Sequence, residues 1–289
     1  MTARGARAPV GLGKAANELL ASLEAPVLRA ELVSPLPSAT ARKRCYRIDL
    51  ADGRTVKLRR STSEDEARQY ADLVRALADP RLARVLDRRA DVTLEEWIPG
   101  TTLRDLEPSP THTAAGGELL GALHAVRGLR AIELPAVMST HPVRDQLDSD
   151  LETILEMDAI PSDVGVRLRA RIARHDPGTA RAGVLHTDLC PENLVLDSGG
   201  VIRAIDNEGM RIGAIGFDLA RVWYRWPMSA VDWDGFLAAY AHRGVLADVI
   251  AQFPFWQIAA VAQSAYIRLT RRTAHADLPV RYLVSLAAT

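Results

Sequence analysis

The sequence predicts an α+β protein in two parts, a small antiparallel sheet followed by a mostly helical region. Before residue 98, apolar and polar residues alternate in several short runs, as they do in half-buried strands. After residue 100, most apolar residues recur at helical spacing instead. The turn-forming stretch Ile-Pro-Gly at 98–100 separates the two patterns. We therefore expect an N-lobe at residues 1–97 and a C-lobe at residues 98–289.

The N-lobe elements follow from local signals. An apolar face at helical spacing over 17–28 predicts a helix. Alternation predicts strands on both sides of Asp52 and Gly53, a dipeptide typical of hairpin turns. Ser61 or Ser63 can cap a helix whose first turn is acidic, which favours the helix dipole. The expected strands are 29–34, 45–50, 54–59, 85–87 and 92–97, with a second helix at 61–77 inserted after the third strand.

The C-lobe is expected to be helical around one further hairpin. The turn Ser-Gly-Gly at 198–200 joins two apolar runs, 193–197 and 201–206, which predicts two paired strands. The stretch 184–196 has strand character at both ends. Helices are expected at 113–126, 143–158, 162–174, 217–226, 231–243 and 255–272.

Composition narrows the class of protein. The chain has 289 residues, of which 48% are hydrophobic, so it can bury a core. Lys and Arg number 36 and so do Asp and Glu, and this zero net charge disfavours a nucleic-acid binder. We expect no membrane segment and no signal peptide, because no long apolar run is present. Two cysteines, Cys45 and Cys190, have no metal or disulfide spacing, so we expect a cytoplasmic protein.

A polar loop between apolar runs carries the clearest chemical signal. It holds His186, Asp188 and Asn193, and Asp206 follows the next apolar run. A carboxylate and an amide oxygen on one hairpin suit Mg²⁺ that also holds phosphates. A separate carboxylate, Asp188, can orient an attacking hydroxyl. The alternative is that these residues only form turns. His186 is expected to orient the loop through hydrogen bonds.

Lys57 is the candidate cation for nucleotide phosphates. Only three of the 36 basic residues are lysines, so a lysine within a strand is a stronger signal here than in most chains. Such a lysine needs a carboxylate to hold it. Glu66 shares a helix face with Tyr70 and Leu73, which points it towards the sheet. The alternative is that Lys57 lies on a solvated strand face and that Glu66 only complements the helix dipole.

Taken together, a series of short stretches resembles the aminoglycoside phosphotransferase/choline kinase-like family of small-molecule kinases. They occur in the family's order and span most of the chain. The matching stretches are 56–58, Glu66, 94–100, 119–124, 186–193, 205–206 and 217–220. The resemblance implies a bilobal, protein-kinase-like fold that uses ATP and Mg²⁺ to phosphorylate a hydroxyl of a small molecule, such as an aminoglycoside-like antibiotic, a sugar or another metabolite.

The resemblance also implies roles for individual residues on the acceptor and metal side. Asp188 would be the catalytic base, and Asn193 and Asp206 would be the magnesium ligands. Asp218 would brace the catalytic loop.

On the nucleotide side, Lys57 would contact the α- and β-phosphates and would be held by Glu66. The backbone near Glu96 and Ile98 would contact the adenine.

Some features depart from the family or leave alternatives open. The stretch 34–44, where a phosphate-covering loop is expected, contains no glycine. A nucleotide-binding module without transfer activity is therefore the second hypothesis. A protein kinase is the third, because Cys190 stands where serine/threonine protein kinases usually carry lysine.

The acceptor leaves little trace in the sequence. Seven acidic residues and no basic residue lie between Asp145 and Asp163, which would suit a polycationic acceptor or a solvated helix face. The aromatic residues of the last third are expected either in the core or along a pocket. The expected partners are a nucleoside triphosphate and a small hydroxyl compound, with no nucleic acid and no membrane. The oligomeric state stays open.

Overall fold

The computed structural model describes residues 13–33, 44–129, 132–271, 273 and 275–288, and the chain forms two compact units. The first unit contains the chain up to Thr102 together with Val195–Glu208 and a short piece at 130–132. The second contains Leu103–Leu129, Glu133–Leu194 and Gly209–Thr289. This division differs from the expected boundary at residues 97 and 98, because a hairpin from the second half of the chain pairs with the first.

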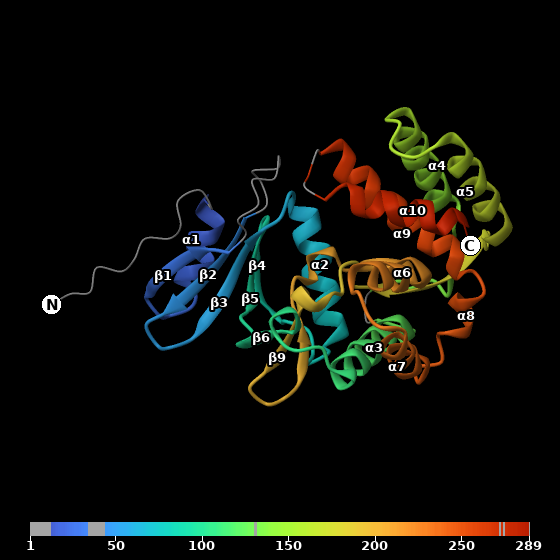
Figure 1. Ribbon diagram of the computed structural model, residues 1–289. Helices are drawn as coiled ribbons and strands as arrows, with labels where there is room; N and C mark the ends of the chain where they lie inside the picture. Colours follow the sequence, from blue (N-terminus) through green and yellow to red (C-terminus); the bar gives the residue numbers. More distant parts are fainter. Residues whose placement is uncertain (1–12, 34–43, 130–131, 272, 274, 289) are drawn as a thin grey trace. The chain divides into compact units, whose positions relative to one another are not determined.

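A five-stranded antiparallel sheet forms most of the first unit (Figure 1). Its strands run in the order β1-β2-β3-β5-β4. Helix α1 (Gly13–Ala21) precedes the sheet, and α2 (Glu64–Leu77) follows the third strand, as the sequence predicts. The strands are β1 (Val27–Leu32), β2 (Arg44–Leu50), β3 (Thr55–Arg60), β4 (Val85–Arg89) and β5 (Val92–Glu96).

Alternating apolar residues build the core of this sheet. Ile48 and Leu58 are fully buried and pack with Leu19 of α1. The first helix is shorter than expected: it ends at Ala21, and residues 27–28 belong to β1. Glu24 has a φ of 56° and Pro26 follows, so a helix cannot continue through this stretch.

The second predicted hairpin is present and completes the first unit. Strands β9 (Leu194–Asp197) and β10 (Ile202–Ala204) form a three-stranded sheet with β6 (Gly100–Thr102), in the order β10-β9-β6. Gly100 permits this pairing, because a Cβ there would lie 2.3 Å from the carbonyl oxygen of Leu196.

The second unit is mostly helical (Figure 1). A short antiparallel sheet in the order β11-β8-β7 lies among its helices. Three single-turn 3₁₀ helices lie in the connecting segments, and one of them starts in the first unit. The helices are α3 (Pro110–Ala125), α4 (His141–Glu156), α5 (Ser162–His175), α6 (Ile215–Arg225), α7 (Ala230–Ala241), α8 (Ala247–Ile250), α9 (Phe253–Thr270) and α10 (Asp277–Ala288). The strands are β7 (Val137–Ser139), β8 (Thr179–Leu185) and β11 (Arg211–Ala214), and the 3₁₀ helices are η1 (Leu103–Asp105), η2 (Pro191–Asn193) and η3 (Asn207–Gly209).

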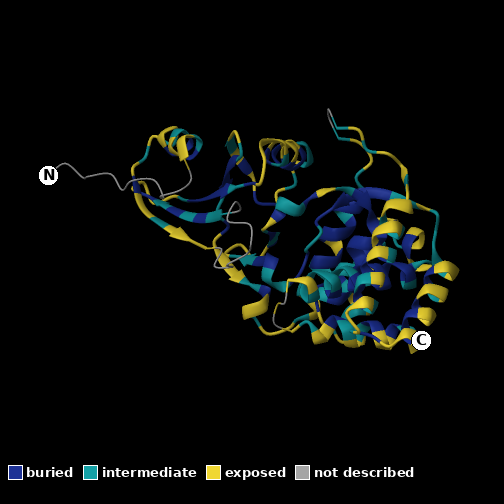
Figure 2. Cartoon of the chain, turned by 90° about the horizontal axis from the view of Figure 1, so that it is seen from above, coloured by how far each residue is buried: buried dark blue, intermediate teal, exposed yellow. Residues whose placement is uncertain are grey.

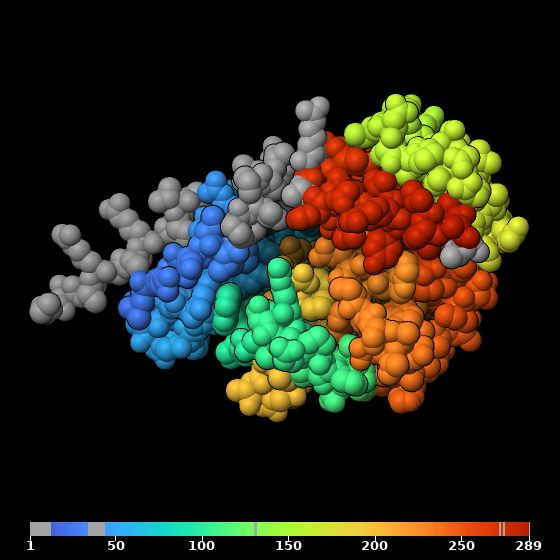
Figure 3. Space-filling model, viewed as in Figure 1, coloured from blue at the N-terminus to red at the C-terminus, as the bar shows by residue number. Residues whose placement is uncertain are grey.

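Large aromatic side chains fill the core of the helical unit. Phe236, Tyr240, Phe255 and Trp256 are among the largest fully buried side chains. Buried residues gather inside this unit and exposed residues lie on its outer helices (Figure 2). On the face seen in Figure 3, α9 and α10 form a continuous surface with α4 and α5 beside them. These aromatic residues therefore belong to the core. None of the described helices is long and apolar enough to cross a membrane.

Candidate active site

The loop after β8 is held by one buried carboxylate, that of Asp218 in the first turn of α6. Asp218 Oδ2 accepts a hydrogen bond from the backbone N–H of His186 at 2.7 Å, and Oδ1 accepts one from that of Thr187 at 2.8 Å. His124 Nε2 lies 3.2 Å from Oδ2. Thr187 has a φ of 71°, a conformation rare for a side chain branched at Cβ. Asp218 thus holds the loop in a conformation that it would not adopt by itself.

The charge of Asp218 is maintained although the residue is completely buried. Burial alone would raise the pKa of its carboxyl, but the hydrogen bond and charge of His124, with the contribution of His186, hold the pKa below its ordinary value. His124 in turn contacts the hydroxyl of Tyr240 at 2.8 Å through Nδ1. The bracing role expected for Asp218 is the one that this geometry supports.

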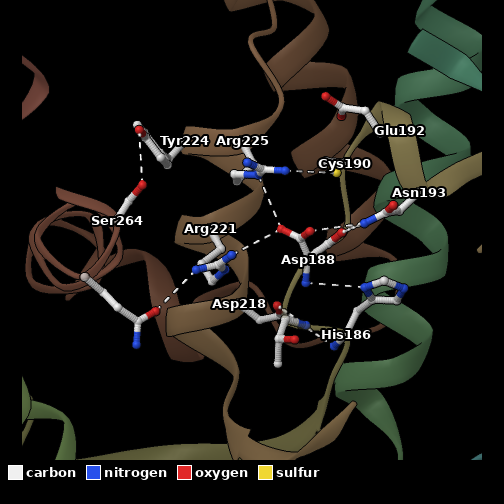
Figure 4. Close-up of polar contacts among 12 residues, drawn as sticks. His186, Asp188, Cys190, Glu192, Asn193, Asp218, Arg221, Tyr224, Arg225 and Ser264 are labelled. Atoms are coloured by element: carbon white, nitrogen blue, oxygen red, sulfur yellow. Dashed lines mark hydrogen bonds and ion pairs between the residues drawn. The ribbon is translucent and has the colours of Figure 1, made fainter. Parts of the chain in front are cut away.

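Asp188 and Asn193 lie together at the end of this loop (Figure 4). The Nδ2 group of Asn193 donates to the carbonyl oxygen of Asp188 at 2.8 Å and to its Oδ2 at 3.2 Å. This orientation turns the Oδ1 atom of Asn193 away from Asp188 and leaves a hard oxygen ligand on the other side of the amide. His186 is fully buried, and its Nδ1 accepts from the N–H of Asp188 at 3.4 Å, so it orients the loop as expected.

Two arginines that the sequence analysis did not single out contact Asp188. From α6, Arg221 Nη2 lies 3.1 Å and Arg225 Nε lies 3.3 Å from the same oxygen, Oδ1. Figure 4 shows both guanidinium groups converging on the carboxylate. They stand four residues apart and so share one helix face, three and seven residues after Asp218. This spacing from Asp218 is the signal that could have found them.

Lys57 lies in the first unit, where it is buried rather than solvated. Its Nζ forms ion pairs with Asp206 Oδ1 at 2.7 Å and with Glu95 Oε2 at 3.7 Å. Burial alone would lower the pKa of the ammonium group, but the charge of Glu95, with smaller contributions that include Asp206, holds it well above its ordinary value. Lys57 is therefore a charged group, already associated with one candidate metal ligand.

Glu95, not Glu66, is the glutamate that pairs with Lys57 in the described part of the chain. Lys57 and Glu95 are directly opposite in the β3–β5 register, so their side chains lie on the same face. The carboxylate of Glu66 instead accepts hydrogen bonds from the backbone N–H of Thr62, at 2.9 Å, and from its hydroxyl. Glu66 thus closes the start of α2, much as in a capping box. Few residues separate Lys57 from the start of α2, and this short connection explains why Glu66 does not pair with the lysine.

Asp206 follows β10 with a φ of 56°, an uncommon conformation that aspartate adopts more readily than most residues. Its side chain is 52% exposed, which leaves it accessible to a ligand besides Lys57. Glu96 accepts two hydrogen bonds from Arg203, at 3.0 and 2.9 Å, and two from Arg84, through its backbone N–H at 3.3 Å and its Nε at 3.1 Å. The side chain of Glu96 therefore stabilises the fold. Ile98 packs on Ala83 and Val195. An adenine contact of the backbone near Glu96 and Ile98 stays a prediction.

The model of the phosphotransferase enzyme family (APH) matches residues 33–253. The chain belongs to this family. No curated protein matches it by sequence.

Solved structures of phosphotransferases share its fold. The choline kinase LicA from Streptococcus pneumoniae aligns with a TM-score of 0.66 at 16% identity, covering 94% of this chain and 96% of that one. The macrolide 2'-phosphotransferase MphH from Brachybacterium faecium gives 0.64 at 17% identity, covering 92% and 95%. An aminoglycoside-3'-phosphotransferase of type VIII gives 0.58 at 21%, covering 84% and 97%. The fold is therefore α+β and kinase-like, as expected.

A cavity of about 240 Å³ lies in the second unit, beside the end of β8 that leads into the loop with Asp188. Leu185, Arg211, Phe217, Asp150 and Gln263 are among its lining residues. Gln263 also accepts a hydrogen bond from Arg221 at 3.3 Å, so the wall of the cavity is connected to a residue that contacts Asp188.

The acidic stretch that suggested a polycationic acceptor is partly neutralised. Asp148 pairs with Arg144 at 2.7 Å, and Asp163 pairs with Arg167 at 2.6 Å. Asp150 is buried at the cavity, where burial raises the pKa of its carboxyl against the hydrogen bond that Gln146 donates. Of the acids in this stretch, Asp150 is the one that lines the cavity.

Proposed function

We propose that this chain transfers the terminal phosphoryl group of ATP to a hydroxyl of a small molecule, with Asp188 as the catalytic base. The observation that carries the proposal is the way the loop is built. Its backbone is anchored on the buried, charged Asp218, and the Asp188 carboxylate is oriented by Asn193. A turn without a chemical role would not need a completely buried carboxylate to hold it in a strained conformation.

The residues present fit a magnesium ion of the kind that kinases use. Mg²⁺ favours oxygen ligands and keeps positions for water and substrate phosphates, so it needs few protein groups. The Oδ1 atom of Asn193 and the exposed carboxylate of Asp206 have the required chemistry. Among the described residues, no group of three His, Cys, Asp or Glu side chains is suited to hold a metal by itself. The ion would neutralise phosphate charge during transfer.

The remaining roles concern the nucleotide. Lys57 would bind the α- and β-phosphates, which add negative charge at the ammonium group that now pairs with Asp206. Glu95 would keep that ammonium charged and in place. The backbone near Glu96 and Ile98 would hold the adenine.

In the transfer itself, Asp188 accepts the proton of the acceptor hydroxyl while the hydroxyl oxygen bonds to the γ-phosphorus. The bond from that phosphorus to the bridging oxygen breaks, and ADP leaves with its electron pair. Most of the rate would come from positioning and charge stabilisation, because phosphoryl transfer needs little covalent help from the protein.

The test is Asp188→Asn, assayed by ADP release over a panel of hydroxyl compounds. We expect acceptor-stimulated turnover to fall by about 100-fold or more, the usual contribution of a general base. Binding of Mg–ATP should stay within a few-fold of wild type. Asp234→Asn, on the exposed face of α7, is the matched control and should keep full activity. Wild-type turnover by Asp188→Asn would reject the assignment, and Mg–ATP binding without transfer to any acceptor would favour a binding module.

A further inference from the structure

The carboxylate of Asp188 is more crowded with positive charge than a catalytic base requires. One oxygen, Oδ1, contacts both Arg221 and Arg225, and the other, Oδ2, accepts from Asn193 (Figure 4). The three ionised side chains together carry one net positive charge. Glu192, the next acid along the loop, is paired with Arg104 at 3.6 Å. Asp188, Arg221 and Arg225 therefore form a small electropositive cluster in the second unit.

This arrangement disfavours the approach of a neutral or cationic acceptor to Oδ1, the oxygen that both guanidinium groups contact. For its hydroxyl to reach Oδ1, at least one guanidinium group must give up its contact with Asp188. The two side chains are only 20% and 31% exposed, so water replaces that contact poorly. Arg221 already has a buried Nε with no hydrogen-bond partner in the described part of the chain. A cationic acceptor would add repulsion to this cost.

An acceptor with an oxyanion removes the difficulty. A carboxylate or phosphate matches the planar fork of a guanidinium group, which binds such anions through two hydrogen bonds. If the anion takes over Arg221 and Arg225, Oδ1 of Asp188 becomes available to the hydroxyl on the same molecule. The arginines then exchange one anionic partner for another, and no buried charge is left without a partner.

We propose that Arg221 and Arg225 form an oxyanion-binding site next to Asp188, and that the acceptor carries a carboxylate or phosphate close to the hydroxyl that is phosphorylated. The proposal rests on the proposed function for the role of Asp188. The cavity beside the loop is consistent with it, because Arg211 and Gln263 line that cavity together with apolar groups. Asp150 is its acidic member, and it is buried against Gln146.

The first experiment measures anion binding without turnover. Malonate and inorganic phosphate are titrated by calorimetry into wild type, Arg221→Gln and Arg225→Gln, with Arg167→Gln on the outer face of α5 as the matched control. Loss of a charge-assisted hydrogen bond weakens binding by about 10- to 100-fold, and we expect this for both site variants and not for the control. Arg221→Lys and Arg225→Lys keep the charge and should lie in between. Equal binding in wild type and in all variants would overturn the proposal.

The second experiment identifies the class of acceptor and separates this proposal from the proposed function. ADP release is compared for glycerate, glycerol 3-phosphate, glycerol and choline. We expect kcat/KM to be at least about 100-fold higher with one of the two anionic alcohols than with glycerol or choline. Arg225→Gln should lower kcat/KM for that anionic alcohol by more than about 10-fold. Which of the two is preferred tells whether the site takes a carboxylate or a phosphate. Transfer to choline or glycerol alone would support a phosphotransferase and reject the anion site. Arginine-dependent anion binding without any transfer would support the anion site and reject the phosphotransferase function.

Discussion

Glu95 offers the sharpest test of how the first unit holds its lysine. The residue is 1% exposed, and its carboxylate contacts Arg59 Nε at 2.9 Å, Thr93 Oγ1 at 2.7 Å and Lys57 Nζ at 3.7 Å. Glu95→Ala removes the anion between two buried cations. Breaking a buried ion pair by removing one partner costs about 3–5 kcal/mol of unfolding free energy. Lys57 keeps Asp206 as a partner, so we expect the lower end of this range.

The assay is urea unfolding followed by circular dichroism, with ATP affinity measured on the same proteins. Glu95→Gln keeps the shape but not the charge, and should lose less stability than Glu95→Ala. Asp206 would then be the remaining ion-pair partner of Lys57 among the described residues, and we expect ATP to bind about 10-fold more weakly, the effect of one charge-assisted contact. Glu66→Gln is the matched control, since that carboxylate contacts Thr62. If the Glu95 and Glu66 variants unfold at the same urea concentration, the assignment of Glu95 is wrong.

The pH dependence of this ion pair has a defined sign. Burial would raise the pKa of Glu95, but Lys57 and Arg59 outweigh it and lower the pKa below 4.5. A lowered pKa stabilises the folded state above the unfolded value, and this contribution disappears as the pH falls through the folded pKa. Lys57, whose pKa is raised above 10.5, loses its contribution only in stronger alkali. The stability difference between wild type and Glu95→Gln should therefore be constant between pH 6 and 9 and shrink below about pH 4.

Two further predictions concern the second unit. Asp218→Asn should destabilise it by about 3 kcal/mol, because the buried carboxylate accepts hydrogen bonds from two loop N–H groups and pairs with His124. The urea midpoint of unfolding and the turnover should fall together. Unchanged turnover would show that the loop does not depend on Asp218. Gly117→Ala should lower the free energy of unfolding by more than about 1 kcal/mol, because the new Cβ would lie 2.3 Å from the carbonyl oxygen of Phe236. In Gly235→Ala the new Cβ meets open space, so the variant should stabilise α7 by about 0.5–1 kcal/mol. Thermal unfolding of both variants checks the contrast.

Local signals accounted for the sheet and most of the helices. The alternation around Asp52 and Gly53 predicted β2 and β3 within one residue of their observed ends, because each strand buries one apolar face whatever else the chain does. The strands β6, β7 and β11 were missed. Each is three or four residues long and exists only because a distant strand pairs with it, so no local pattern marks it.

The candidate site also contains features that the sequence predicted and features that it did not. The order and spacing of Asp188, Asn193, Asp206 and Asp218 were readable from the chain, and a short loop next to a strand keeps Asp188 and Asn193 close to each other. The partner of Lys57 was not readable. Glu95 is 38 positions away, and only the β3–β5 register places it opposite the lysine.

The amino-acid sequence by itself determined the class of fold, the family and the identity of the loop that carries the candidate base. These depend on periodicity and on short spacings, which act within a few residues. Only the tertiary structure decided which charges are neighbours: Glu95 beside Lys57, and Arg221 and Arg225 on Asp188. Charge pairing in a buried setting depends on distance in space and on exclusion of water, and neither can be inferred from distance along the chain.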